Sequence, residues 1–126
     1  MRTLVVLGLM MVGLVIGALY SQQYLADSGQ KLSAQIEDVQ IAINEGNWQE
    51  ADKLTEELIR SWHKTSIGWG LLTEHQEIDD INNTLARLSG FVKDKEAPSS
   101  LAEGKAALHL FRHIPEKESL TLANLL

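Results

Sequence analysis

Apolar residues form one uninterrupted segment near the N-terminus and recur at helical spacing through the rest of the chain. No charged residue stands between Arg2 and Asp27, and residues 4–20 are almost entirely apolar. Because a helix rises about 1.5 Å per residue, roughly 17–25 apolar residues cross the hydrocarbon core of a bilayer. The segment therefore predicts a membrane-spanning helix, and Tyr20 and Tyr24 suit its interface with water.

A cleaved signal peptide is the alternative for this segment. Signal peptides carry a shorter apolar region, about 7–15 residues, which ends at a cleavage site flanked by small residues. The apolar run here is longer, and the bulky Tyr20 occupies the best candidate site. We therefore expect residues 1–24 to be an uncleaved signal anchor, with a secreted soluble helical domain as the alternative.

The charges that flank the segment predict its orientation. Arg2 precedes it, whereas the first positive charge after it is Lys31. Under the positive-inside rule the N-terminus stays in the cytoplasm, and residues 25–126 form a domain outside the cytoplasmic membrane. Within the span, Gly13 and Gly17 allow close approach of a second helix. A homodimer through the membrane helix is one reading of this pair, and chance recurrence of glycine is the other.

The rest of the chain predicts an all-α fold, in which the transmembrane helix is followed by a small antiparallel helical domain of about four helices. Apolar residues at three- and four-residue spacing mark these helices within residues 25–43, 51–62, 71–92 and 101–114. The first stripe begins directly after the anchor and is interrupted by Gly29. We expect the anchor and the first domain helix to form one nearly continuous rod.

Glycines and polar residues predict where these helices begin and end. Gly46 suits the left-handed conformation of a helix C-terminus, and Asn47 with Glu50 resembles a capping box at the start of the next helix. Residues 67–70, Ile-Gly-Trp-Gly, are expected to break or bend the chain. A loop is expected at residues 93–100.

The C-terminal part of the chain predicts a fourth helix and an apolar tail. Ser100 and Glu103 form a second capping-box pattern, and Pro115 should end the helix. Four leucines follow: Leu120, Leu122, Leu125 and Leu126. A segment this apolar is expected to fold back onto the bundle.

Charge and composition narrow the classes of partner. The chain holds 17 acidic against 11 basic residues, and because only Arg2 precedes the span, the domain is more acidic than the net charge of −6 for the whole chain. An acidic surface argues against nucleic acid, whose phosphates require basic residues, and against anionic lipid bound through a basic patch. Since the chain has no cysteine, it has neither disulfides nor thiolate chemistry.

The chain resembles an uncharacterised family of single-pass bacterial membrane proteins in three features. This family is known only as a domain of unknown function and is found mostly in Gram-positive spore formers. The three features are the segment His-Gln-Glu-Ile-Asp-Asp-Ile at residues 75–81, the three tryptophans, and the segment His-Ile-Pro-Glu-Lys-Glu at residues 113–118. The resemblance covers nearly the whole chain and implies an anchor followed by a helical domain. It implies no established activity, so no catalytic residue and no cofactor is carried over.

Histidines and carboxylates provide the candidate chemistry. His75 lies on the apolar stripe with Asp79 one turn later and Glu77 between them, and such a pairing can bind a metal or act as a general base. A buried histidine satisfied by a hydrogen bond is the reading we favour, because neither a nucleophile nor a third ligand stands nearby. His109 and His113 have the spacing of a shared zinc site, but they lack the glutamate that metalloproteases place after the first histidine.

Three tryptophans, Trp48, Trp62 and Trp69, are many for a domain of this size. We expect them to form a core cluster; partly exposed, they would be anchors for a partner protein. Together with the anchor, the absence of a catalytic grouping favours an interaction module over an enzyme. Such a module would be an accessory subunit or scaffold for another integral membrane protein. A small ligand- or metal-sensing domain that uses the histidines is the alternative.

The uncleaved anchor is tested by the mass of the mature protein. Because the apolar run exceeds the usual length in a signal peptide, protein extracted from membranes should retain residues 1–24. Mass spectrometry of the intact chain measures this directly. A mature chain that begins at or after residue 21 would instead identify a secreted domain.

Overall fold

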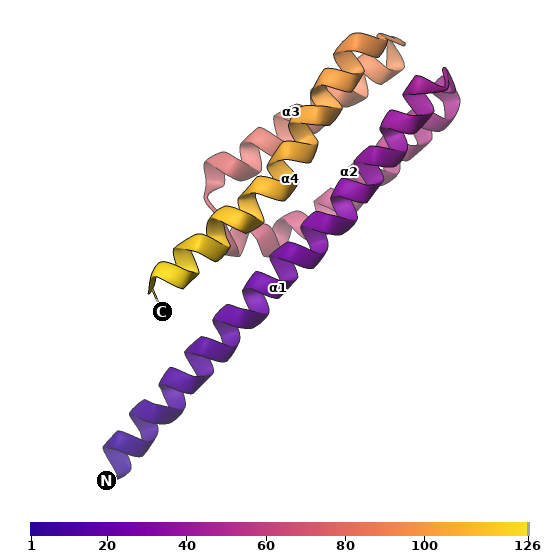
Figure 1. Cartoon of the computed structure of the whole chain (residues 1–126). Coiled ribbons are helices and arrows are strands. Elements are labelled where there is room, and N and C mark those ends of the chain that lie inside the picture. Colours follow the sequence, from indigo (N-terminus) through magenta and orange to yellow (C-terminus); the bar gives the residue numbers. More distant parts are fainter. Residues whose placement is uncertain (126) are drawn as a thin grey trace.

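Four helices joined by short turns form an antiparallel bundle (Figure 1). The computed structural model describes residues 1–125. The helices are α1 (Arg2–Asn44), α2 (Trp48–Leu72), α3 (His75–Lys93) and α4 (Ala97–Leu125). Both α1 and α3 pack against α2 and α4, so the helices form a four-membered ring around one core. The all-α prediction is confirmed.

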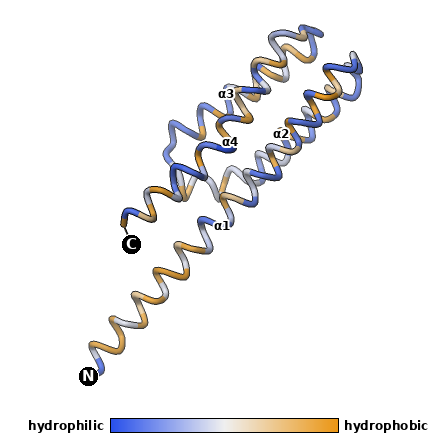
Figure 2. The backbone as a smooth tube through the Cα atoms, in the orientation of Figure 1, coloured by the Kyte–Doolittle hydropathy of each residue, from blue (hydrophilic) through white to orange (hydrophobic). Residues whose placement is uncertain are grey.

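The first helix, α1, extends far beyond the bundle (Figure 1). It has 43 residues without a break, which corresponds to about 65 Å at 1.5 Å per residue. Its N-terminal part is apolar (Figure 2) and contains a stretch long and apolar enough to cross a membrane, none of which is buried by the rest of the protein. The prediction of one continuous rod from the apolar segment into the domain is therefore confirmed.

An aromatic cluster forms the centre of the core. The rings of Trp62, Trp69 and Phe111 are fully buried, with centroids 5.4 to 6.0 Å apart. Each indole N–H has an acceptor: Trp62 donates to Asn82 Oδ1 at 2.7 Å, and Trp69 donates to Ser28 Oγ at 2.8 Å. These hydrogen bonds offset the cost of taking the two N–H groups out of water. Trp62 and Trp69 thus belong to the core.

The contact between α1 and α4 is closest at Gly29. Pro115 lies inside α4 and does not end it, so that prediction is wrong. Proline has no N–H, and the Phe111 carbonyl group therefore lacks its usual partner within α4. This oxygen lies against Gly29, where an added Cβ would be 2.6 Å from it and 3.1 Å from Pro115 Cγ. Gly29 lets the two helices approach closely, and the packing between them keeps α4 helical beyond Pro115.

The predicted break at residues 67–70 is also wrong, since α2 continues to Leu72. Each glycine in a helix costs about 1 kcal/mol relative to alanine. Two tertiary contacts offset this cost. Trp69 is buried in the core, and Gly68 provides space for Tyr24, whose hydroxyl oxygen would lie 2.6 Å from a Cβ at that position.

The turn between α2 and α3 lies later than predicted. Thr73 ends α2, and both its backbone N–H and its hydroxyl group donate to the Trp69 carbonyl oxygen. Leu71, predicted to begin the third helix on its buried side, is 83% exposed at the end of α2. His75, predicted on a buried stripe, is an exposed residue at the first position of α3.

The start of α4 also differs from the prediction. The helix begins at Ala97 and holds Pro98 in its first turn, where a missing N–H has no helical partner to lose. The predicted loop is therefore shorter than residues 93–100. The predicted capping box is wrong, because Ser100 is buried inside the helix and Glu103 instead pairs with Arg87 at 2.9 Å.

The turn between α1 and α2 follows the local sequence signals. Gly46 has a φ of 72°, in the left-handed region that glycine adopts without strain. Asn47 caps α2 by accepting a hydrogen bond from the Glu50 backbone N–H at 3.2 Å. The predictions for Gly46 and for Asn47 as the cap are confirmed. The capping box is incomplete, because the Asn47 N–H donates to the Ala42 carbonyl oxygen and not to Glu50.

The leucine tail continues α4 as helix to Leu125 and lies beside α1. Gln22 Nε2 donates to Ser119 Oγ at 2.6 Å and ties the two helices together at this level. Leu120 and Leu125 are exposed, and Leu122 is half-buried. Leu126 lies outside the described residues.

Replacing Gly29 with alanine should destabilise the protein, because the added methyl group would lie 2.6 Å from the Phe111 carbonyl oxygen. Overpacking of this kind costs about 1–3 kcal/mol. Denaturant unfolding of the whole chain in detergent, followed by circular dichroism, measures the free energy of unfolding.

Gly90→Ala is the matched control for Gly29→Ala. Gly90 also lies within a helix, but a Cβ there meets no atom within 4 Å. Alanine at this position should stabilise α3 by about 0.5–1 kcal/mol. If Gly29→Ala proves as stable as the wild type, the close contact between α1 and α4 is contradicted.

Candidate functional site

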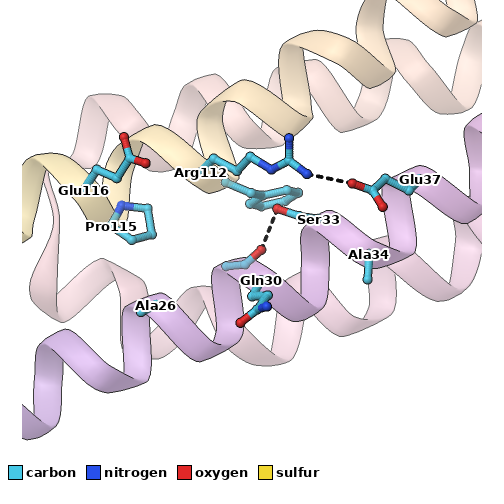
Figure 3. A pocket seen from close by; sticks show the side chains of 10 residues that line it. Ala26, Gln30, Ser33, Ala34, Glu37, Arg112, Pro115 and Glu116 are labelled. Carbon is cyan, nitrogen blue, oxygen red and sulfur yellow. Dashed lines mark hydrogen bonds and ion pairs between the residues drawn. The ribbon is translucent and has the colours of Figure 1, made fainter.

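A groove of about 420 Å³ lies between α1 and α4 (Figure 3). Most of its lining is small or polar, and the residues come from successive turns of the two helices. They are Ala26, Gly29, Gln30, Ser33, Ala34 and Glu37 of α1 with Phe111, Arg112, Pro115 and Glu116 of α4. Its floor is the close contact at Gly29, so the sequence features that bring the helices together also shape the groove.

Polar contacts fix the walls of this groove. Ser33 Oγ is buried and donates to the Gly29 carbonyl oxygen at 2.7 Å. Arg112 Nη2 reaches across from α4 to Glu37 Oε1 at 2.6 Å (Figure 3). Both partners of this ion pair are about half exposed, and such pairs contribute little to stability, roughly 0–1 kcal/mol. The pair can therefore exchange its partners for groups on another molecule at small cost.

The groove offers shape and hydrogen bonding to a ligand. Ala26, Gln30 and Ala34 are exposed along one face of α1. The small side chains of Ala26 and Ala34 let another helix or an extended segment approach the backbone of α1 closely. Gln30 supplies both a donor and an acceptor. These properties suit the binding of a polypeptide segment.

A charged cluster lies where the start of α3 meets the C-terminal half of α4. Lys117 Nζ lies 2.9 Å from Glu77 Oε1 and 3.9 Å from Glu74 Oε1. The side chain of Glu77 is only 14% exposed, and its Oε2 is buried without a hydrogen-bond partner in the part of the chain that the structure describes. Burial, followed by the charge of Glu77, raises the pKa of Glu118, whereas the hydrogen bond to Glu77 raises the pKa of Lys117.

This cluster was not found by reasoning from the sequence. The prediction placed Glu77 with its neighbours on α3, His75 and Asp79, both of which are exposed. Glu77 instead turns to Lys117 on α4. Because Pro115 was expected to end α4, the sequence pattern did not predict that Lys117 lies beside the start of α3.

Two of the other three histidines lie on α4. His109 and His113 are exposed, and their rings are stacked with centroids 5.2 Å apart and an interplanar angle of 10°. His75 lies on a different helix. Among residues 1–125, no three histidine, cysteine or acidic side chains gather in a way that could hold a metal ion.

The other predicted contact residues divide between core and surface. Trp62 and Trp69 are buried and present no surface to a partner, whereas Trp48 is half-buried and packs against the core. Gly13 and Gly17 lie in the uncovered half of α1, and a Cβ at either position meets no atom within 4 Å. This glycine face is therefore open to a second helix.

The fold places the protein in the class of antiparallel four-helix bundles. Its first helix projects beyond the bundle as a candidate membrane span. The chain belongs to the family described as a domain of unknown function (DUF4363), whose model matches residues 19–125. The match thus includes the whole bundle. No curated protein and no solved structure matches the chain.

The charged cluster predicts a specific pH dependence of stability. Because the pKa of Glu118 is raised above its usual 4.5 in the folded protein, the folded state binds this proton more tightly than the unfolded chain. Glu118→Gln should therefore be more stable than the wild type at neutral pH, by a few degrees or less in the melting temperature. As the pH falls through the raised pKa, the wild type gains stability and the difference should close.

Thermal melts of the detergent-solubilised protein from neutral to mildly acidic pH measure this difference. Glu116→Gln is the control, since Glu116 is an exposed carboxylate one position away from Lys117. A constant gap between Glu118→Gln and wild type at every pH would contradict the raised pKa of Glu118.

Proposed function

We propose that the protein is a membrane-anchored, extracytoplasmic interaction module, an accessory or scaffold subunit of another integral membrane protein. The single observation that supports this most strongly is the uncovered face of α1. It runs from the apolar segment, through Ala26 and Gln30, into the groove beside α4. One helix thus presents a surface to the bilayer and, directly above it, a surface to a protein.

The proposal makes the N-terminal part of α1 a single-pass anchor of the cytoplasmic membrane, with the N-terminus inside. In support, this segment is long and apolar enough to span a bilayer, and the bundle covers none of it. Apolar side chains exposed over such a length would be unfavourable in water. Arg2 at its start, with no other basic residue until Lys31, favours this orientation.

The continuous α1 restricts where a partner can bind. If the outer edge of the hydrocarbon core lies near Gln22, as a span of about 20 residues requires, the groove residues from Ala26 to Glu37 stand about 6 to 22 Å above it at 1.5 Å per residue. No flexible linker separates anchor and domain, since α1 is unbroken. The partner must then present its binding segment close to the bilayer, as a loop or juxtamembrane helix of an integral membrane protein does.

The anchor itself offers a second packing surface in this proposal. Gly13 and Gly17 are four residues apart and open, and such a pair lets helices in membranes pack closely. A transmembrane helix of the partner, or a second copy of this chain, would occupy it. We assign no reaction and no cofactor to the protein.

Site-specific photocrosslinking in native membranes tests the proposal. A photoreactive amino acid in place of Gln30, in the groove, should give an adduct with one integral membrane protein, identified by mass spectrometry. The same amino acid in place of Lys105, an exposed residue on α4 outside the groove lining, is the matched control and should not. Adding Ala34→Arg, which fills the groove, should abolish the Gln30 adduct.

Two results would contradict the proposal. One is a Gln30 adduct pattern identical to that of Lys105. The other is a Gln30 adduct that persists after Ala34→Arg. Circular dichroism of the Ala34→Arg variant, expected to match the wild type because Ala34 is exposed, excludes unfolding as the cause of any loss.

A further inference from the structure

The C-terminal turns of α4 lie level with the part of α1 that enters the apolar segment. The hydrogen bond between Gln22 and Ser119, at 2.6 Å, places these two residues side by side. At the same level, a groove of about 260 Å³ is lined by residues between 18 and 25 of α1, by residues between 118 and 125 of α4, and by Leu72 of α2. Because the helices run antiparallel, each further residue of α4 lies deeper along α1.

This register places the end of α4 in the membrane, on the premise of the proposed anchor. A bilayer core of about 30 Å takes roughly 20 helical residues. Counted from Arg2, such a span ends near Gln22, which is the residue bonded to Ser119. The residues from Leu120 to Leu125 then extend about 9 Å to the membrane side of that boundary.

The distribution of charge agrees with this depth. On α1 the uncharged segment ends at Asp27, and on α4 the last charged residue is Glu118. Residues 119–125, Ser-Leu-Thr-Leu-Ala-Asn-Leu, carry no charge. Both helices therefore change from charged to uncharged at nearly the same level, and Figure 2 shows apolar residues at the C-terminal end of α4 as in the projecting part of α1.

Exposed leucines give this segment an apolar surface without a protein partner. Leu120 is 68% and Leu125 79% exposed. Because these leucines lie beside the proposed span, the acyl chains of lipids would cover them. An attraction of basic residues to anionic headgroups is not involved, because residues 116–118, just above this segment, are Glu-Lys-Glu and carry a net negative charge.

We propose that residues 119–125 of α4 are embedded in the bilayer interface beside α1 and give the domain a second attachment to the membrane. These seven residues are too few to cross the bilayer, since a span takes roughly 20. The last carbonyl groups of a helix need partners outside it, which keeps this end of α4 within reach of water and headgroups. Because α4 runs antiparallel to the span, it enters the interface end-on. Its depth of about 9 Å is close to the 5–10 Å by which interfacial helices bury their apolar faces.

The second attachment has a consequence for the groove. Both helices that line the groove, α1 and α4, run from it into the lipid. With two points of attachment instead of one, the bundle has a fixed tilt and rotation relative to the membrane. The groove is then held upright above the bilayer.

Single-cysteine labelling tests this inference, and the absence of native cysteine makes each label unique. The whole chain is labelled with an environment-sensitive fluorophore at Leu120→Cys and reconstituted in phosphatidylcholine vesicles. Spin-labelled lipids then serve as quenchers. Leu9→Cys, within the apolar segment, reports on the anchor, and Ile41→Cys is the matched control, an apolar residue 54% exposed near the far end of α1.

We expect the Leu120 and Leu9 labels to be quenched several-fold more strongly than the Ile41 label, with Leu120 responding best to spin labels placed near the headgroup. Quenching at Leu9 with a Leu120 signal equal to that of Ile41 would overturn the second attachment and leave the anchor in place. Absence of quenching at Leu9 as well would overturn both the anchor and the attachment that rests on it.

Discussion

The approach of α1 to the Phe111 carbonyl group of α4 determines how the rest of the structure is arranged. Pro115 leaves this carbonyl without a partner in its own helix, and only a residue without a side chain can lie against it. Gly29 is that residue. The effect of this close approach is geometric, because it fixes the register of the two longest helices.

The groove, the charged cluster and the C-terminal turns of α4 all depend on that register. Above the contact, the ion pair between Arg112 and Glu37 closes one side of the groove. On the far side of Pro115, α4 continues as helix and brings Lys117 to the carboxylates at the start of α3. Closer to the C-terminus of α4, Ser119 is hydrogen-bonded to Gln22 at the level where α1 becomes apolar. A helix that ended at the proline would have none of these last contacts.

The sequence predicted those features that depend on neighbouring residues. The continuous α1 follows from an apolar segment that passes directly into the first amphipathic stripe, and the turn at Gly46 and Asn47 follows from local backbone preferences. The predictions that are wrong concern features that depend on contacts between residues far apart in the sequence. Gly68 and Pro115 disfavour helices locally, yet packing against α1 outweighs that preference. The pairing of Glu77 with α4 could not be predicted for the same reason, because it joins residues 40 positions apart.

The proposed function depends on α1 being one rigid helix, which would carry the domain at a fixed position above the membrane. A distance measurement between spin labels at Leu9→Cys and Ile41→Cys, in the reconstituted chain, tests it most directly. A continuous helix predicts a narrow distribution centred at about 48 Å, from 1.5 Å per residue. A broad distribution, or one centred well below this value, would show a hinge between the apolar segment and the bundle and would contradict the claim.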